Sequence, residues 1–180
     1  FLLTHWRVVW NLILSMKKFA NPLQIRYFST TPYLLGTQAV KYSAIPVVEV
    51  PDTIPANPSA DYLREAMVAQ LAKGDAYFDF AVQLQTNADT MPIEDPGVAW
   101  SEAASPFQKV ARIRILQQDF DSEQQREFGE NLSFTPWHSL PEHRPLGGVN
   151  RARKVVYSAI SIFRHEKNHA PRVEPKSWEL

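Results

Sequence analysis

The stretch "PWHSLPEHRPLGGVNRAR", from Pro136 to Arg153, is the part of the sequence that decides the fold. Its prolines and the Gly147-Gly148 pair predict a long irregular segment, because both residue types interrupt helices and strands. The next residues, "KVVYSAISIFRH", contain neither proline nor glycine and predict a helix that Asn150 can cap. Long ordered loops in compact domains often carry function. We therefore look for a functional site where this loop meets the helix.

The predicted helix carries an unusual set of polar side chains on one stripe. Steps of four and eleven residues deviate from whole helical turns by only about 40° and 20°, so Arg153, Tyr157 and Arg164 share a face. Four apolar residues face mostly elsewhere and are expected to hold the helix to a core: Val155, Val156, Ile160 and Phe163. An arginine four residues before a tyrosine is also common on solvent-exposed helices, and the spacing alone leaves that alternative open.

The chemistry of a phenol makes this stripe worth pursuing. A neutral phenol, with a pKa of about 10, is a poor metal ligand. A neighbouring cation lowers such a pKa by about 1–3 units, and a bound ferric ion lowers it further. Tyrosine is a known axial ligand of haem iron, and a second arginine can bind a haem propionate with two hydrogen bonds. Tyr157, Arg153 and Arg164 are therefore candidates for holding an iron porphyrin.

The rest of the chain predicts an α+β fold with an antiparallel sheet, since its strands are grouped rather than alternated with helices. Four segments have strand character: residues 23–29, 38–50, 77–86 and 107–116. Helices are expected after Ser59, ending at Gly74, and after Asp121, with Gln124 completing a capping box. Residues 88–106 form a loop. Four strands are few for a closed barrel, so we expect the sheet to be part of something larger.

Composition excludes several classes of function. The chain has 180 residues, 19 Lys+Arg against 19 Asp+Glu, and no cysteine. The balanced charge argues against a nucleic-acid platform. The absence of cysteine excludes disulfides, cysteine-zinc sites, iron–sulfur clusters and thiol nucleophiles, and it fits a reducing, cytoplasmic compartment.

The opening segment, residues 1–19, is apolar but interrupted by His5, Arg7 and Asn11. It is shorter than the roughly 20 apolar residues of a membrane span, and its lysines come last rather than first as in a signal peptide. We predict a partly buried helix and no membrane span. The first residue, Phe1, is not methionine, which indicates processing or a fragment.

Other catalytic motifs are weaker. A zinc site at His138, Glu142 and His143 would need different spacing and no Pro141. A carboxylate pair drawn from Glu94, Asp95 and Glu102 has no fixed separation. Neither a nucleophile elbow nor a glycine-rich phosphate motif is present.

The block from Pro136 to Arg153 resembles the catalase superfamily, and more narrowly its short, catalase-related haem proteins. Their proximal pattern, arginine then tyrosine four residues later, falls on Arg153 and Tyr157, and a further family arginine falls on Arg164. The resemblance extends over most of residues 21–168 and implies part of an antiparallel β-barrel with flanking helices. It also implies haem b as cofactor, Tyr157 as iron ligand, and Arg153 and Arg164 as haem contacts.

The same resemblance implies that one part of the site lies elsewhere. In this family a histidine and an asparagine act on the peroxide, and both lie in an earlier section of the chain. None of the histidines of this sequence stands in a stretch that resembles the one around the family's distal histidine. We therefore expect residues 1–169 to be the proximal part of a catalase-like haem domain without its distal half, and residues 170–180 to be a loose tail. The implied function is a haem-dependent oxidoreductase acting on hydrogen peroxide or on an organic or lipid hydroperoxide, with a homo-oligomer as one form. The alternative is a truncated, non-catalytic remnant that serves as an interaction domain.

Overall fold

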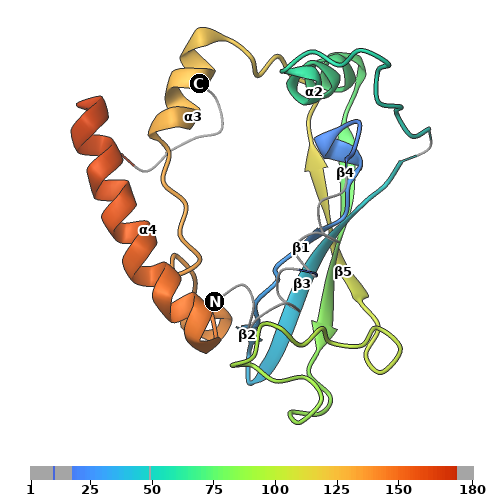
Figure 1. The fold of residues 1–180 in the computed structure, drawn as a ribbon, viewed down its shortest axis with the longest axis vertical. Helices are drawn as coiled ribbons and strands as arrows, with labels where there is room; N and C mark the ends of the chain where they lie inside the picture. The colour runs from blue at the N-terminus through green and yellow to red at the C-terminus, as the bar shows by residue number, and fades with distance from the viewer. Residues whose placement is uncertain (1–9, 11–17, 49, 174–180) are drawn as a thin grey trace.

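The computed structural model describes residues 10, 18–48 and 50–173, and its centre is a five-stranded antiparallel sheet. The strands are β1 (Tyr27–Phe28), β2 (Tyr33–Leu35), β3 (Gln38–Pro46), β4 (Ala76–Leu84) and β5 (Gln108–Ile115). They lie in the order β1-β3-β4-β5, and β2 also pairs with β3 (Figure 1). The predicted α+β class with an antiparallel sheet is confirmed. Over the described residues the sheet is open and does not close into a barrel.

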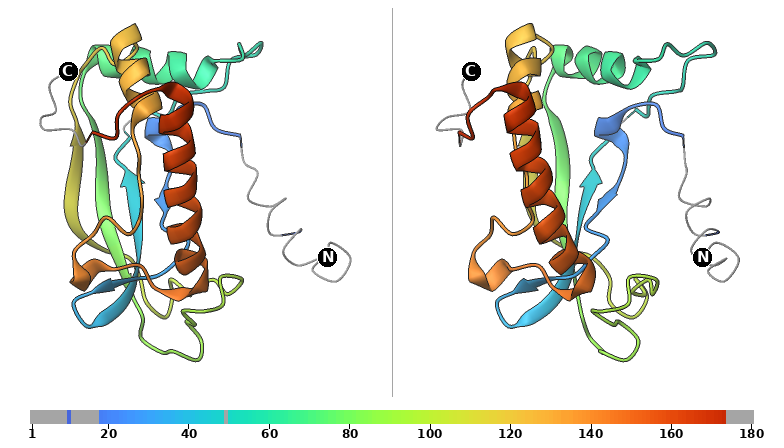
Figure 2. Two further views of the ribbon diagram at one scale, coloured as in Figure 1. Left: turned by 90° about the vertical axis from the view of Figure 1, so that its left-hand side faces the viewer. Right: turned by 60° about the vertical axis from the view of Figure 1, so that its left-hand side comes forward.

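Within residues 18–48 and 50–173, three α-helices and two short 3₁₀ helices accompany the sheet. They are η1 (Pro22–Gln24), α2 (Tyr62–Lys73), α3 (Glu123–Asn131), η2 (Pro141–His143) and α4 (Gly147–Asn168). Helix α2 lies across one end of the sheet, whereas α4 begins beside β2 at the other end and runs toward α3 (Figures 1 and 2). Helix α4 is thus attached at its two ends.

Two small clusters of buried apolar side chains hold these elements. One joins α2 to the sheet through Leu71, Phe78 and Leu23. The other lies under the loop after β4, where Met91 and Trp100 pack with Ala39, and Ile93 and Leu146 pack against them. The second cluster matters for the site, because Leu146 immediately precedes α4.

Several expectations about individual strands are corrected. The segment 23–29 forms η1 and only a two-residue strand, because Asn21 caps the helical turn with its side chain. The turn region around Thr31 and Gly36 contains the unexpected strand β2. The strand predicted at 107–116 forms as β5, and it is exposed along nearly its whole length; among the described strands it pairs only with β4.

Helix boundaries also differ from prediction. Helix α2 starts three residues after Ser59, although Gly74 ends it as expected. Helix α3 is capped by Ser122, whose hydroxyl accepts from the Gln125 N–H, one residue later than the predicted Asp121–Gln124 box. The predicted helix at residues 1–19 lies almost entirely outside the described residues, as does most of the tail after residue 170. Within the described part of the chain, no helix is both long and apolar enough to cross a membrane.

The last helix begins earlier than predicted and is less buried. Helix α4 starts at Gly147, so Asn150 lies inside its first turn rather than at its cap. The apolar residues expected to pack it on a core are exposed, with Val155 71% and Phe163 58% accessible. The buried side chains of α4 include the polar residues Asn150, Ser161 and His165.

Candidate functional site

The structure brings Arg153 and Tyr157 into direct contact on α4. Arg153 donates from Nε and Nη2 to the Tyr157 phenol oxygen, at 3.2 and 3.0 Å. The guanidinium carbon lies 5.0 Å from the centroid of the Tyr157 ring. Two N–H groups from one fixed cation stabilise negative charge on the oxygen that accepts them. The predicted pair is therefore in contact, with two guanidinium N–H groups directed at the phenol oxygen.

Asn150, one turn earlier, holds the far side of the guanidinium. Its Oδ1 accepts from Arg153 Nη1 at 3.3 Å and from the Thr31 hydroxyl at 3.1 Å. Its Nδ2 donates to the carbonyls of Pro32 and Leu146, at 3.0 and 2.8 Å. Asn150 is 0% exposed. Residues far apart in sequence thus meet at one buried amide.

Trp137 adds a further contact to the same residue. Its indole Nε1 donates to the Asn150 carbonyl at 2.8 Å, and Lys154 Nζ lies 4.7 Å from the Trp137 ring centroid. Trp137 belongs to the irregular stretch that precedes α4. The loop and the helix predicted to form the site are therefore joined directly beside Arg153.

A third attachment fixes the start of α4 to the loop after β4. Glu94 forms a two-point ion pair with Arg151, both N···O distances being 3.0 Å, and accepts the Gly148 N–H at 2.8 Å. The Arg151 guanidinium, and to a smaller degree the Gly148 N–H, hold the pKa of Glu94 below its usual range. A carboxylate at a helix N-terminus is favourable because it satisfies a free N–H and the helix dipole. Glu94 thus does the capping that was predicted for Asn150.

Gly147 allows this close approach. Its φ is +83°, and a Cβ at this position would lie 2.7 Å from the Ile93 carbonyl oxygen. Any larger residue would therefore meet both a strained backbone and a clash with main chain. The glycine predicted to break structure in fact begins the helix.

Two hollows adjoin the Tyr157 side chain. One, of about 510 Å³, is lined by Arg153, Tyr157, His138 and residues 132–136. The other, of about 320 Å³, is lined by Tyr157, Ile160, Ser161, Arg164 and residues 133–134. Phe134 borders both and is 80% exposed. The phenol thus lies in a concave region with apolar and cationic walls, of a size typical of cofactor sites.

Arg164 lines the second hollow but already has partners. Its Nη2 donates to the carbonyls of Glu130 and Leu132, where α3 ends. Its Nε is buried and has no hydrogen-bond partner among the described residues. A buried N–H without a partner is costly, so this atom fits an acceptor supplied from outside the chain. The predicted haem-propionate role of Arg164 stays a prediction.

The donor set fits a haem group better than a metal ion bound by the protein alone. Among the described residues, no group of three or more histidine, aspartate or glutamate side chains could hold a metal. A phenol oxygen beside a guanidinium suits a ferric ion whose other ligands come from a porphyrin. Tyr157 would be the ligand, Arg153 its support, and Arg164 Nε a donor to a carboxylate.

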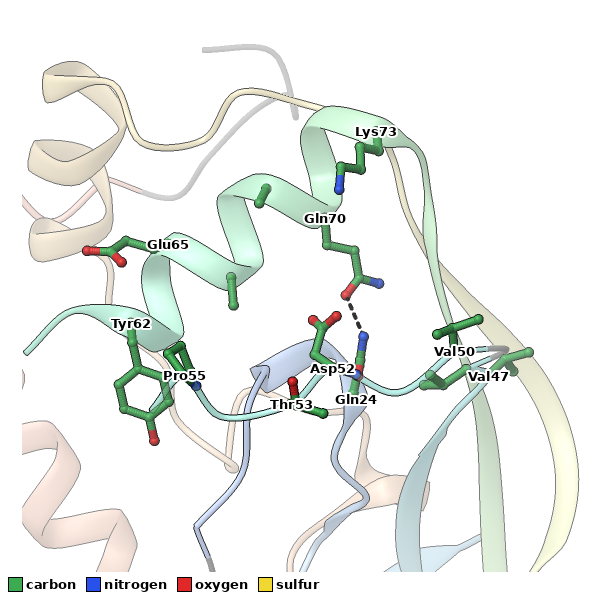
Figure 3. Close-up of a pocket in the computed structure, with 13 residues that line it drawn as sticks. Gln24, Val47, Val50, Asp52, Thr53, Pro55, Tyr62, Glu65, Gln70 and Lys73 are labelled. Carbon is green, nitrogen blue, oxygen red and sulfur yellow. Dashed lines mark hydrogen bonds between the residues drawn. The ribbon is translucent and has the colours of Figure 1, made fainter. Parts of the chain in front are cut away.

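Another hollow, of about 620 Å³, lies away from these residues, between η1, α2 and residues 47–55 (Figure 3). Two glutamines that line it pair with each other, and the neighbouring Asn21 binds two of its lining residues. Gln24 Nε2 donates to Gln70 Oε1 at 3.3 Å, and Asn21 Nδ2 donates to Asp52 and Gln70 at 2.8 and 2.7 Å. These bonds fasten α2 to the chain that enters and leaves the sheet.

Sequence reasoning missed four residues that build the site: Thr31, Glu94 in its capping role, Trp137 and Asn150. Trp137 and Asn150 belong to the "PWH" and "NRAR" parts of the stretch quoted above. Their position in the sequence did not predict the contact between them. Thr31 and Asn150 are 119 positions apart, and no local pattern links residues at that separation.

Fold and site together define a chain with an antiparallel sheet and a long helix that presents a guanidinium-supported phenol. No family model matches the sequence, and no curated protein matches it either. Solved structures do match, and all three described here are catalases. A fungal catalase superposes with a TM-score of 0.68 at 18% identity over 84% of this chain. Catalase A from Saccharomyces cerevisiae gives 0.63 at 14% over 82%, and a bacterial catalase gives 0.68 at 16% over 94%.

The chain therefore has a catalase-like fold, as the sequence resemblance implies. It spans about a third of the length of these structures, with 33%, 33% and 37% of each covered. The likeness concerns the fold alone. What this chain binds and does is a separate question.

Proposed function

We propose that this chain is the proximal part of a haem-dependent oxidoreductase that acts on peroxides, with Tyr157 as the iron ligand. The observation that carries the proposal is the pair of hydrogen bonds from Arg153 to the Tyr157 oxygen, in a hollow, on a catalase-like fold. The substrate class is hydrogen peroxide or an organic or lipid hydroperoxide. The absence of cysteine supports a reducing, cytoplasmic location.

Bound haem b would supply the redox chemistry that cleaves a peroxide O–O bond. The residues of this chain have supporting roles. Tyr157 would bind the iron through its phenol oxygen, Arg153 would support that oxygen with its two hydrogen bonds, and Arg164 would offer its buried Nε–H to a haem carboxylate. The acid–base groups that move the peroxide proton would come from polypeptide that corresponds to the rest of the catalase structures, of which this chain covers about a third. Strands that continue the open sheet into a barrel would come from there too.

Haem titration of the 180-residue chain tests this proposal. We expect a ferric Soret band with the charge-transfer bands of tyrosinate ligation, and we expect Tyr157→Phe to lose them. Arg153→Ala should keep the fold but weaken iron binding, because the phenolate loses its cation. Lys167→Gln, which removes a cation from an exposed position in the last turn of the same helix, is the matched control. A ferric spectrum identical in wild type and Tyr157→Phe would refute the proposal.

A second candidate is a catalase-like remnant that binds no haem and serves as an interaction domain. The exposed apolar side chains on α4, including Val155 and Phe163, favour it. The same titration separates the two, because the remnant predicts no tyrosinate bands at any haem concentration. Peroxide turnover by this chain alone would contradict our assignment of the acid–base groups to another segment.

A further inference from the structure

We propose that Asn150 is a positioning residue that fixes the Arg153 guanidinium against Tyr157. For its effect on iron binding this inference rests on the proposed function, but its structural part does not. Neither the sequence resemblance nor the comparisons assign Asn150 a role.

The hydrogen-bond partners of Asn150 leave only one orientation of its amide. Arginine has no acceptor atoms, so the group that faces Arg153 Nη1 must be the oxygen. The carbonyls of Pro32 and Leu146 have no donors, so the group that faces them must be the NH₂. A carboxylate would set oxygen against two carbonyl oxygens, and a leucine would satisfy none of these groups. An amide of this length satisfies all four side-chain partners of residue 150 at once.

The network also explains why the guanidinium holds its place. Arg153 is only half-buried, and a long side chain at such a position loses considerable rotamer entropy when it is fixed. Its Nη1 is bound by Asn150 while Nε and Nη2 face the phenol oxygen. Three of its N–H groups thus have defined acceptors at the two ends of one helical turn. Among the residues that the structure describes, removal of the Asn150 acceptor would leave Tyr157 as the only hydrogen-bond partner of the Arg153 guanidinium.

Asn150 in turn is fixed by a distant segment. Pro32 O accepts both the Asn150 amide and the Leu146 N–H, the latter at 3.0 Å, and Thr31 donates to Asn150 Oδ1. The loop before β2 therefore sets where the amide lies, and the amide sets where the guanidinium lies. The position of the charge beside Tyr157 depends on a segment that never touches the tyrosine in these contacts.

The first test needs no haem. Exchange of the Arg153 Nε–H with solvent is measured by ¹⁵N NMR on the full chain, and its resonance is identified by its loss in Arg153→Lys. We expect roughly tenfold faster exchange in Asn150→Ala, from the loss of one hydrogen bond to a charged group. Lys167→Gln, at an exposed position in the last turn of the same helix, should leave the rate unchanged. If Asn150→Ala does not fold, Asn150→Ser, whose hydroxyl is too short to replace the amide, takes its place with the same expectation.

Asn150→Asp distinguishes positioning from simple support of the fold. It keeps an acceptor for Arg153 but loses both donors, so the free energy of unfolding should fall while Arg153 Nε–H stays protected. A residue that only stabilises the fold would make exchange follow stability in both variants. That outcome, or an unchanged exchange rate in Asn150→Ala, would overturn the inference.

The second test asks whether the effect reaches the iron through Arg153. In a double-mutant cycle, Asn150→Ala should lower haem affinity in the wild-type background but cause no further change in Arg153→Ala. Equal effects in both backgrounds would show that Asn150 does not act through Arg153. If Tyr157→Phe leaves the haem spectrum intact, the proposed function fails while the NMR result still decides the positioning role.

Discussion

The first turn of α4 and its middle are two parts of one helix with opposite surroundings. In the first turn, Asn150 is fully buried and bonded, and Gly147 touches main chain of another loop. Two turns later, Val155 and Ile160 are largely exposed. Precise attachment at one end fixes where Tyr157 lies, while the bare middle offers apolar surface beside it. The difference teaches that residues of this chain hold the Tyr157 phenol in place, whereas the apolar surface beside it is left uncovered by the described residues.

The largest effect should come from Gly147→Ala. The new Cβ would meet the Ile93 carbonyl oxygen at 2.7 Å in a backbone of positive φ, and strain plus overpacking should cost about 3 kcal/mol. Gly36→Ala is the control, because its φ is also positive but nothing lies within 4 Å; its cost should be about 1 kcal/mol. Denaturation in guanidinium chloride measures the free energy of unfolding of both variants. Equal costs would mean that the close approach to Ile93 does not hold the helix.

A smaller loss should follow Arg164→Met, which removes the donors to the Glu130 and Leu132 carbonyls. Hydrogen bonds to charged groups contribute about 1.5–3 kcal/mol, and partial exposure places the expected loss near the lower end. Asn168→Ala removes only an exposed side-chain bond to Asn131 and should cost less. Far-UV circular dichroism of the folded variants should show a small loss of total helix content in Arg164→Met and none in Asn168→Ala. Unfolding curves that are the same for both variants would contradict the link between α3 and α4.

The Glu94–Arg151 pair should give the anchored end a dependence on pH. Because the folded pKa of Glu94 is lowered from its ordinary 4.5, the pair contributes stability above that value and loses it as pH falls through the folded pKa. The difference in unfolding free energy between wild type and Glu94→Gln should therefore be present at pH 6 and shrink toward pH 3. Arg151→Gln should reproduce this trend in urea unfolding. A difference that persists at the acid end would exclude the ion pair as its cause.

The smallest effect should come from the middle of the helix. Val155→Thr keeps the shape of a side chain that is 71% exposed, and its effect on unfolding should stay within about 0.5 kcal/mol. If thermal unfolding instead shows a loss comparable to that of Arg164→Met, something covers this surface in solution, and the contrast between the two parts of α4 would disappear.

The sequence predicted much of this arrangement where the signal is local. The alternation in residues 77–86 gave β4, and the four-residue step from Arg153 to Tyr157 gave their contact, because both depend only on backbone periodicity. Gly74 ended its helix as expected. These features need no knowledge of distant segments.

The predictions that were wrong concern residues whose contacts depend on segments far away in the sequence. Asn150 was predicted to be a cap because asparagine favours that position, but Glu94, from a loop more than fifty residues away, caps the helix instead. Gln83 is a polar residue of β4 that is nevertheless buried, because its amide donates to the carbonyls of Trp100 and Ser105 in the loop that covers it. The apolar residues on α4 predicted a core that the described part of the chain does not supply.

Strand β5 has a consequence for how the molecule behaves in concentrated solution. It is an exposed outer strand whose side chains include Lys109, Arg112 and Arg114, two of which pair with Asp79 and one with Asp75. Three cations share two carboxylates along this strand, and the remaining positive charge opposes the edge-to-edge pairing of a second copy. Added salt screens that repulsion. Strand β5 should therefore resist edge-to-edge association best at low ionic strength. Light scattering should rise as salt is added.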